Sequence, residues 1–289
     1  MPESIAIIYF SGTGNTEVVT GFLAKKLREY FYVDVFRAED ITRGNVEFEP
    51  GKYRMIGLGY PVYGFNVPKI MYNLIQKMPG AAGQKAFVYS TCAGPLYFNN
   101  IASYGLKKEL KAKGFNVFYE RQFYMPANIA TRYNDEVAKQ LCNKASEKAV
   151  TMVEEIRNNV KNVRTDRIGP KLMSWLYLIE KKAWKRVSGD FIVLESCTKC
   201  RKCIRDCPME NITFSDEKIV FGKNCTACYR CVYMCPVRAI TGRKYKFAIF
   251  KDGYDIKKIL TDDKLKGDYI TLKTRGYYGV FKKYLFKKR

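Results

Sequence analysis

The first 160 residues alternate short apolar runs with longer segments in which apolar residues recur at helical spacing. The runs are rich in β-branched and aromatic residues, which is typical of strands buried on both faces. These predicted strands are Ser4–Phe10, Tyr32–Phe36, Tyr53–Tyr60, Lys85–Thr91 and Phe115–Tyr124. The predicted helices are Asn15–Tyr30, Pro68–Met78, Ile101–Lys113 and Asp135–Val160. Five strands that alternate with helices predict an α/β fold with a doubly wound parallel sheet.

In such a sheet, ligands bind beyond the carboxyl ends of the strands, where the strand order reverses. The loops that follow the first, third and fourth predicted strands are therefore the candidate ligand-binding segments. They are Ser11–Thr16, Pro61–Asn66 and Thr91–Tyr97.

Residues 161–194 form a predicted linker that contains one more amphipathic segment, Lys171–Val187. Its apolar face carries Leu172, Trp175, Leu176, Ile179, Ala183 and Val187. We favour a helix that docks one domain on the other. A basic helix that lies on a membrane surface is the alternative, and the sequence does not separate the two.

The composition limits the size of the fold and the kinds of site that the chain can form. Its 289 residues are enough for about two domains, and a hydrophobic fraction of 47% indicates that they are folded. It contains ten cysteines and no histidine, which excludes histidine-dependent nucleophiles, histidine-bound zinc, Rieske centres and histidine-held haem. The first residues lack the features of a signal peptide, so we expect a cytoplasmic, reducing setting in which clustered cysteines bind metal.

Eight of the ten cysteines lie in two runs of one pattern, C-x-x-C-x-x-C-x-x-x-C-P. The first run begins at Cys197, and the second begins 28 residues later at Cys225. Asn211-Ile212 and Ala239-Ile240 follow at equivalent distances, so the region is a duplicated half-domain. Thiolate ligands without imidazole favour iron–sulfur clusters. Neither a pair of four-cysteine zinc sites nor a disulfide knot requires this repeated spacing.

Residues 195–242 resemble the bacterial 2[4Fe-4S] ferredoxin domain, a small α+β fold, through both cysteine runs. The resemblance implies two [4Fe-4S] clusters that each transfer one electron. It assigns Cys197, Cys200, Cys203 and Cys235 to the first cluster, and Cys225, Cys228, Cys231 and Cys207 to the second. The motifs are flanked by basic residues, so we expect higher reduction potentials than in similar clusters with acidic surroundings.

The loop Ser11-Gly12-Thr13-Gly14-Asn15-Thr16 offers hydroxyl groups and backbone N–H groups at a helix N-terminus, which suits a phosphate. It fits neither the dinucleotide-binding fingerprint nor the Walker A motif, and a plain turn is the alternative. It is similar to the FMN-phosphate loop of flavodoxins, and this resemblance implies bound FMN. The flavin ring would then be flanked by Pro61, Val62, Tyr63, Gly64, Phe65 and Asn66, and by Thr91, Cys92, Ala93, Gly94 and Tyr97. Cys92 also fits a small buried thiol.

Residues 1–160 and 195–242 together resemble flavodoxin–ferredoxin fusion proteins of anaerobes, the EFR-type ferredoxin family. The resemblance implies an iron–sulfur flavoprotein that transfers electrons between FMN and the clusters, and so couples two-electron and one-electron redox partners. The alternative is a flavin-dependent reductase or dehydrogenase of a small organic substrate, such as a quinone or porphyrinogen, with the clusters as a relay. No residue marks a catalytic group, so the sequence does not decide whether the protein is an enzyme.

The net charge is +23, and residues 243–289 hold 15 basic against 5 acidic residues. We interpret this basic, aromatic C-terminal extension as a segment that packs its aromatic side chains on the ferredoxin domain. The second interpretation is a docking site for an acidic protein redox partner of the ferredoxin or flavodoxin type. Peripheral contact with an anionic membrane or with nucleic acid is the third, although no nucleic-acid-binding motif and no transmembrane segment are present.

Overall fold

The computed structural model describes residues 3–96, 99, 101–164, 187 and 189–287. These residues divide into two compact units, and neither unit is one continuous stretch of chain. The first, here the α/β unit, takes in the described residues up to 127, residues 133–164 and residues 256–287. The second, here the cysteine-rich unit, takes in residues 128–132 and the described residues from 187 to 255. The predicted helix Lys171–Val187 lies outside the described residues except for Val187.

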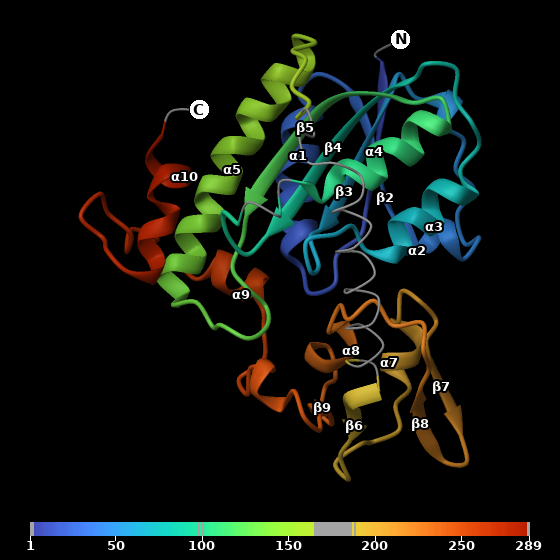
Figure 1. Cartoon of the computed structure of the whole chain (residues 1–289), viewed down its shortest axis with the longest axis vertical. Helices are drawn as coiled ribbons and strands as arrows, with labels where there is room; N and C mark the ends of the chain where they lie inside the picture. The colour runs from blue at the N-terminus through green and yellow to red at the C-terminus, as the bar shows by residue number, and fades with distance from the viewer. Residues whose placement is uncertain (1–2, 97–98, 100, 165–186, 188, 288–289) are drawn as a thin grey trace. The chain divides into compact units, whose positions relative to one another are not determined.

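The α/β unit contains a five-stranded parallel sheet with the strand order β2-β1-β3-β4-β5 (Figure 1). The predicted strands are confirmed to within a few residues, and the doubly wound fold class is confirmed. The strands are β1 (Ser4–Tyr9), β2 (Tyr32–Arg37), β3 (Met55–Pro61), β4 (Lys85–Cys92) and β5 (Asn116–Tyr124). β3 is buried along its whole length, which explains why its sequence is apolar without alternation.

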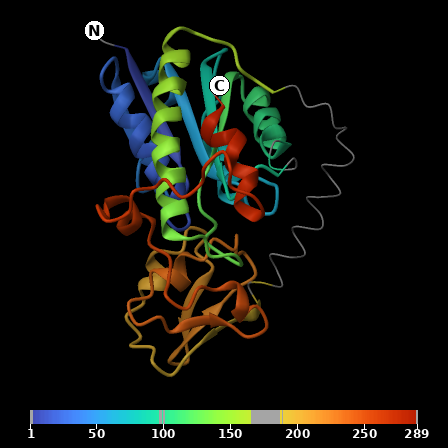
Figure 2. The ribbon, with the colours of Figure 1, turned by 90° about the vertical axis from the view of Figure 1, so that its left-hand side faces the viewer.

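The helices cover both faces of this sheet. α1 packs beside α5, and α3 packs against both α2 and α4 (Figures 1 and 2). These helices are α1 (Asn15–Leu27), α2 (Ala38–Thr42), α3 (Lys69–Lys77), α4 (Ser103–Ala112) and α5 (Asp135–Arg157). α5 begins where the Asn134 side chain accepts a hydrogen bond of 2.8 Å from the Glu136 N–H, a standard N-cap. The short helix α2 was not predicted, because five residues carry too little periodic pattern to identify.

The cysteine-rich unit is built from two copies of a strand–loop–helix–strand arrangement. The first copy has β6 (Phe191–Val193), α7 (Lys202–Arg205) and β7 (Ile212–Ser215). The second has β8 (Lys218–Phe221), α8 (Arg230–Tyr233) and β9 (Ile240–Gly242). β6 pairs with β9 and β7 pairs with β8, so each copy completes its strand pairs with the other. The small α+β architecture expected for this region is therefore present.

The C-terminal extension does not pack as we expected from its sequence. Residues 243–255 belong to the cysteine-rich unit, but residues 256–287 belong to the α/β unit. This C-terminal segment contains α9 (Ile256–Thr261), the 3₁₀ helix η4 (Tyr277–Phe281) and α10 (Lys282–Phe286). It crosses α5, and α10 lies along that helix (Figure 2). Its aromatic residues belong to a core cluster with α5. This packing was not predicted, because the apolar residues of this stretch do not recur at helical spacing.

Candidate functional site

The three candidate loops of the α/β unit meet at the carboxyl ends of β1, β3 and β4. The connection from β1 runs outward to β2 and then back to β3, so the strand order reverses between β1 and β3. The hydroxyls of Thr16 and Thr91 are 2.8 Å apart and join the first loop to the third. The Val62 N–H donates to the Thr91 carbonyl at 2.8 Å and joins the second loop to the third. The predicted segments therefore form one site at the switch point of the sheet.

The loop 11–16 has a backbone that only glycine adopts readily. Gly14 has a φ of 106°, and its N–H donates to the Ser11 hydroxyl oxygen at 3.1 Å. The Gly14 carbonyl accepts the Val18 N–H at 2.9 Å, which is the first helical bond of α1. The side chains of Ser11, Thr13 and Thr16 are buried in this turn. The loop thus places hydroxyl groups and backbone N–H groups at the N-terminus of a 13-residue helix, where an anion is favoured.

The loop 61–66 is a tight turn. Tyr63 and Asn66 exchange both backbone hydrogen bonds, at 3.1 and 3.0 Å. Gly64 and Phe65 between them have φ values of 53° and 71°, and a positive φ is rare for a bulky residue such as phenylalanine. The Tyr63 ring lies edge-on to Phe10, with centroids 6.4 Å apart. Backbone conformations of this kind are concentrated at functional sites, and the Phe65 side chain is half-buried.

The loop 91–97 is described up to Leu96, so the predicted ring contact of Tyr97 lies outside the described residues. Cys92 is buried, and its thiol donates to the Gly94 carbonyl at 3.4 Å. Burial raises the pKa of this thiol to about 12, so Cys92 is protonated and unreactive near neutral pH. The geometry agrees with a small buried thiol at the edge of the site.

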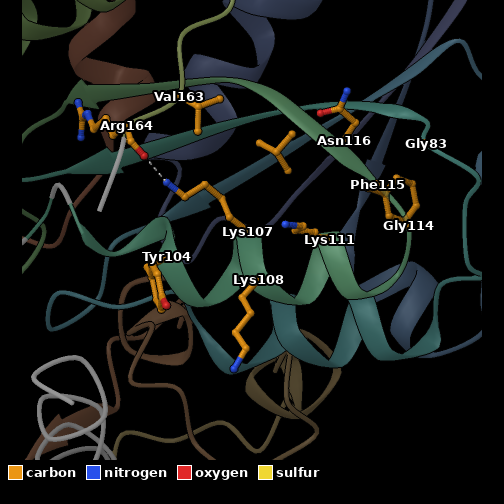
Figure 3. A pocket seen from close by; sticks show the side chains of 11 residues that line it. Gly83, Tyr104, Lys107, Lys108, Lys111, Gly114, Phe115, Asn116, Val163 and Arg164 are labelled. Atoms are coloured by element: carbon orange, nitrogen blue, oxygen red, sulfur yellow. Dashed lines mark hydrogen bonds between the residues drawn. The ribbon is translucent and has the colours of Figure 1, made fainter. Parts of the chain in front are cut away.

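A separate cavity of about 820 Å³ lies near the amino ends of β4 and β5, at the opposite ends of the strands (Figure 3). Lys107, Lys111 and Arg164 are among the residues that line it, and the Lys107 ammonium donates to the Arg164 carbonyl at 3.1 Å. Lys107 also pairs with the buried Glu120 carboxylate at 3.3 Å. None of the residues lining this cavity belongs to the three candidate loops.

In the cysteine-rich unit, the backbone repeats as closely as the sequence does. Three pairs of non-glycine residues with positive φ recur at the spacing of the cysteine runs. They are Lys199 and Ala227 (53° and 50°), Arg201 and Tyr229 (both 58°), and Glu210 and Arg238 (both 49°). The helices α7 and α8 follow the second pair directly. Each run therefore folds into a loop of the same backbone conformation.

The cysteines of the second predicted set come together although they belong to both runs. Cys225, Cys228 and Cys231 line one small cavity together with Cys207 from the first run. Burial raises the pKa of Cys228 to about 12, and the Cys225 and Cys207 thiolates add to that shift against the opposing charge of Arg230.

In the first predicted set, Cys203 interacts electrostatically with one cysteine of each run. Burial raises the pKa of Cys203, and the neighbouring thiolates of Cys197 and Cys235 raise it further. Cys200 is the exposed member, and backbone hydrogen bonding lowers the pKa of its thiol. Burial raises the pKa of Cys231, and Cys203 of the other set is among the cysteines that raise it further, so the two sets are neighbours.

Backbone N–H groups donate to cysteine sulfurs in both copies of the repeat. Asn211 and Ala239 donate to Cys207 and Cys235 at 3.3 Å each, at equivalent positions of the two copies. The Ala227 N–H donates to Cys225 at 3.2 Å. Such bonds stabilise thiolates and tune the potential of an iron–sulfur cluster. The sequence showed that Asn211 and Ala239 stand at equivalent positions of the repeat, but it did not predict that their N–H groups bind sulfur. Their constant distance from the fourth cysteine of each run was the feature that could have indicated this role.

Two further features of the described residues concern single-metal sites and membrane-spanning helices. No group of three or more Cys, Asp or Glu side chains among them converges tightly enough to hold a single metal ion. A cubane binds each thiolate through a different iron, so this finding does not test the cluster assignment. Among the helices that the structure describes, none is long and apolar enough to cross a membrane.

Comparison with known proteins places one family within the chain. Residues 190–237 match the model of a 4Fe-4S dicluster domain. No curated protein matches the chain. The family match carries the assignment of the cysteine-rich unit.

Solved structures similar to the chain include oxidised Flavodoxin 1 from Bacillus cereus, with 19% identity and a TM-score of 0.41. It is matched over 55% of this chain and 99% of its own. A flavodoxin from the domain Archaea has 12% identity and a TM-score of 0.37, over 53% and 99%. The flavodoxin of Streptococcus pneumonia TIGR4 has 16% identity and a TM-score of 0.38, over 54% and 99%. The fold of the α/β unit rests on its own strand order, which is the flavodoxin-like order.

The chain is thus an α/β unit of flavodoxin-like topology joined to a 4Fe-4S dicluster domain. This organisation agrees with the resemblance to flavodoxin–ferredoxin fusion proteins that the two sequence motifs indicated.

Proposed function

We propose that this protein is an electron-transfer iron–sulfur flavoprotein that binds FMN in the α/β unit and two [4Fe-4S] clusters in the cysteine-rich unit. The observation that carries the proposal is the cavity lined by Cys207, Cys225, Cys228 and Cys231. Four thiolates from two different runs have no reason to meet unless they share a ligand, and soft thiolates suit iron–sulfur chemistry.

The first cluster takes Cys197, Cys200, Cys203 and Cys235, which the charge interactions of Cys203 support. The exchange of the fourth cysteine follows from the strand pairing, because β6 and β9 belong to different copies. The N–H groups of Asn211 and Ala239 hold one sulfur of each set. Two ligand sets that are neighbours in one small unit favour rapid transfer between clusters.

For FMN, the buried turn at Gly14 supplies the phosphate site, with Ser11 and Thr13 as hydroxyl ligands. The loops 61–66 and 91–96 follow the neighbouring strands β3 and β4, are joined by the hydrogen bond from Val62 to Thr91, and would flank the ring. FMN exchanges two electrons whereas each cluster exchanges one, so together they couple the two kinds of redox partner. The partner we favour is an acidic redox protein, because the chain is strongly basic. The protein would work in a reducing, cytoplasmic setting that keeps its thiolates free.

The test is anaerobic purification followed by assays of iron, acid-labile sulfide and flavin. We expect about eight irons, eight sulfides and one FMN per chain. Cys203→Ala should lower the iron content, whereas Cys142→Ala, which removes a buried thiol in α5, should leave it unchanged. Zinc in place of iron, or protein that binds no FMN after reconstitution, would refute the proposal.

A further inference from the structure

The C-terminal segment 256–287 is attached to α5 by specific hydrogen bonds. The Gln140 side-chain amide donates to the Ile270 carbonyl at 2.9 Å and accepts the Ile270 N–H at 2.8 Å. The Glu136 carboxylate accepts the Gly267 N–H at 2.6 Å. The Lys139 ammonium donates to the Leu260 carbonyl at 2.5 Å. Polar side chains of one helix face thus replace water on the backbone of this segment and fix its position.

Apolar contacts complete the attachment. Phe281 and Leu285 are buried in a cluster with Val137 and Leu141 of α5. The Tyr284 ring packs at a tilt of 35° against Tyr124 at the end of β5, with ring centroids 4.4 Å apart. The segment is therefore an integral layer of the α/β unit.

The start of α9 lies directly on the candidate phosphate loop. A Cβ atom added to Gly14 would lie 2.9 Å from Cγ2 of Ile256, a residue with 1% of its surface exposed. The Lys257 ammonium also pairs with Glu17 in the first turn of α1 at 2.9 Å. Ile256 thus occupies the side of Gly14 where any other residue would carry its side chain, and it closes that side of the turn.

A second contact supports the loop 91–96. The Phe281 ring lies 3.6 Å from the position of a Cβ at Gly94. Tyr133, whose ring packs against Phe281 with centroids 5.8 Å apart, donates its hydroxyl to the Ala93 carbonyl. The segment therefore contacts two of the three loops that meet at the switch point.

We propose that the C-terminal segment is part of the flavin site, with Ile256 as a positioning residue for the phosphate loop and Phe281 as a positioning residue for the loop 91–96. This inference rests on the proposed binding of FMN. Loops that are ordered before binding lose less entropy on binding. A segment that packs against these loops and orders them therefore strengthens the affinity for FMN without touching the ligand. The segment needs no additional charge for this role, and its basic residues remain at the surface.

The experiment compares two ligands that differ only in the phosphate. Equilibrium dialysis of the flavin-depleted full chain, kept anaerobic so that any clusters remain intact, gives the dissociation constants for FMN and riboflavin. We expect Ile256→Ala to lower the preference for FMN over riboflavin by about tenfold, because it loosens only the phosphate loop. Ile259→Ala removes another buried isoleucine, 8% exposed, from the same helix and should change this preference by less than about twofold. Phe281→Leu should raise the dissociation constants for FMN and for riboflavin by a similar factor.

The outcomes distinguish a failure of the positioning roles from a failure of flavin binding itself. If Ile256→Ala and Ile259→Ala had the same preference for FMN over riboflavin, the role of Ile256 would be overturned, since a general loss of stability affects both variants. Unchanged affinities in Phe281→Leu would overturn the role of Phe281. Failure of the unmodified protein to bind either flavin would instead refute the proposed function.

Discussion

The proposed exchange of the fourth cysteine between two cluster sites predicts different outcomes for two pairs of substitutions. Cys207 belongs to the first run in sequence but lines the cavity of Cys225, Cys228 and Cys231. Replacing two ligands of one cluster should leave the other cluster whole, whereas replacing one ligand of each should leave neither. The double variant Cys207→Ala/Cys228→Ala is therefore expected to retain one intact four-iron cluster, with about four irons bound in it.

The matched variant is Cys207→Ala/Cys200→Ala, which combines two cysteines of the same run. The proposed ligand sets place them in different clusters, because Cys235 is the proposed fourth ligand of the first cluster. We expect about zero intact four-iron clusters in this variant. Both variants lose two thiolates from a chain with eight clustered cysteines, so a simple effect of thiolate number predicts equal losses.

The assay is iron and sulfide analysis after anaerobic purification, with Mössbauer spectroscopy to count intact four-iron clusters. Folding of the remainder is checked by far-ultraviolet circular dichroism, which reports mainly the long helices of the α/β unit. If Cys207→Ala/Cys200→Ala retained the intact cluster and Cys207→Ala/Cys228→Ala lost both, each run would hold its own cluster. The interlocked arrangement would then be wrong.

Three further predictions concern stability and partner binding. Glu120→Ala should lower the free energy of unfolding by about 3–5 kcal/mol, because it leaves the Lys107 ammonium, 12% exposed, without its carboxylate. The exposed Glu147→Ala should cost less than about 1 kcal/mol in the same urea titration, and equal losses would contradict the role of burial. Burial raises the pKa of Cys142 to about 12 from an ordinary value of 9.0, so above pH 9 the unfolded chain releases a proton that the folded chain keeps. The free energy of unfolding should then fall by about 1.4 kcal/mol per pH unit between pH 9 and 12, and Cys142→Ala should remove that part of the slope. Reversing three exposed charges of the C-terminal segment should slow electron exchange with an acidic carrier protein about tenfold at low salt and little at high salt; a loss that persists at high salt would argue against electrostatic docking. The three substitutions are Lys264→Glu, Lys273→Glu and Lys283→Glu.

Much of the fold was predictable because burial leaves a direct mark on the sequence. β3 and β4 are covered on both faces, so they appear as continuous apolar runs. α5 shows one apolar side because only that side faces the core. The cysteine runs were equally clear, since the first three cysteines of each run lie within seven consecutive residues and need only one local loop. The three candidate loops could be grouped because parallel strands place their carboxyl ends at one edge.

The sequence by itself therefore determined the strand and helix order, the site at the switch point and the two cysteine motifs, all of which depend on local pattern. The tertiary structure alone decided where the C-terminal segment packs and that Ile256 lies against Gly14, residues 242 positions apart in the chain. The physical reason is visible in Glu136 and Gln140, whose side chains hold the backbone of that segment. A polar residue on a helix has the same appearance in sequence whether it binds water or a peptide group, so only the folded chain distinguishes the two.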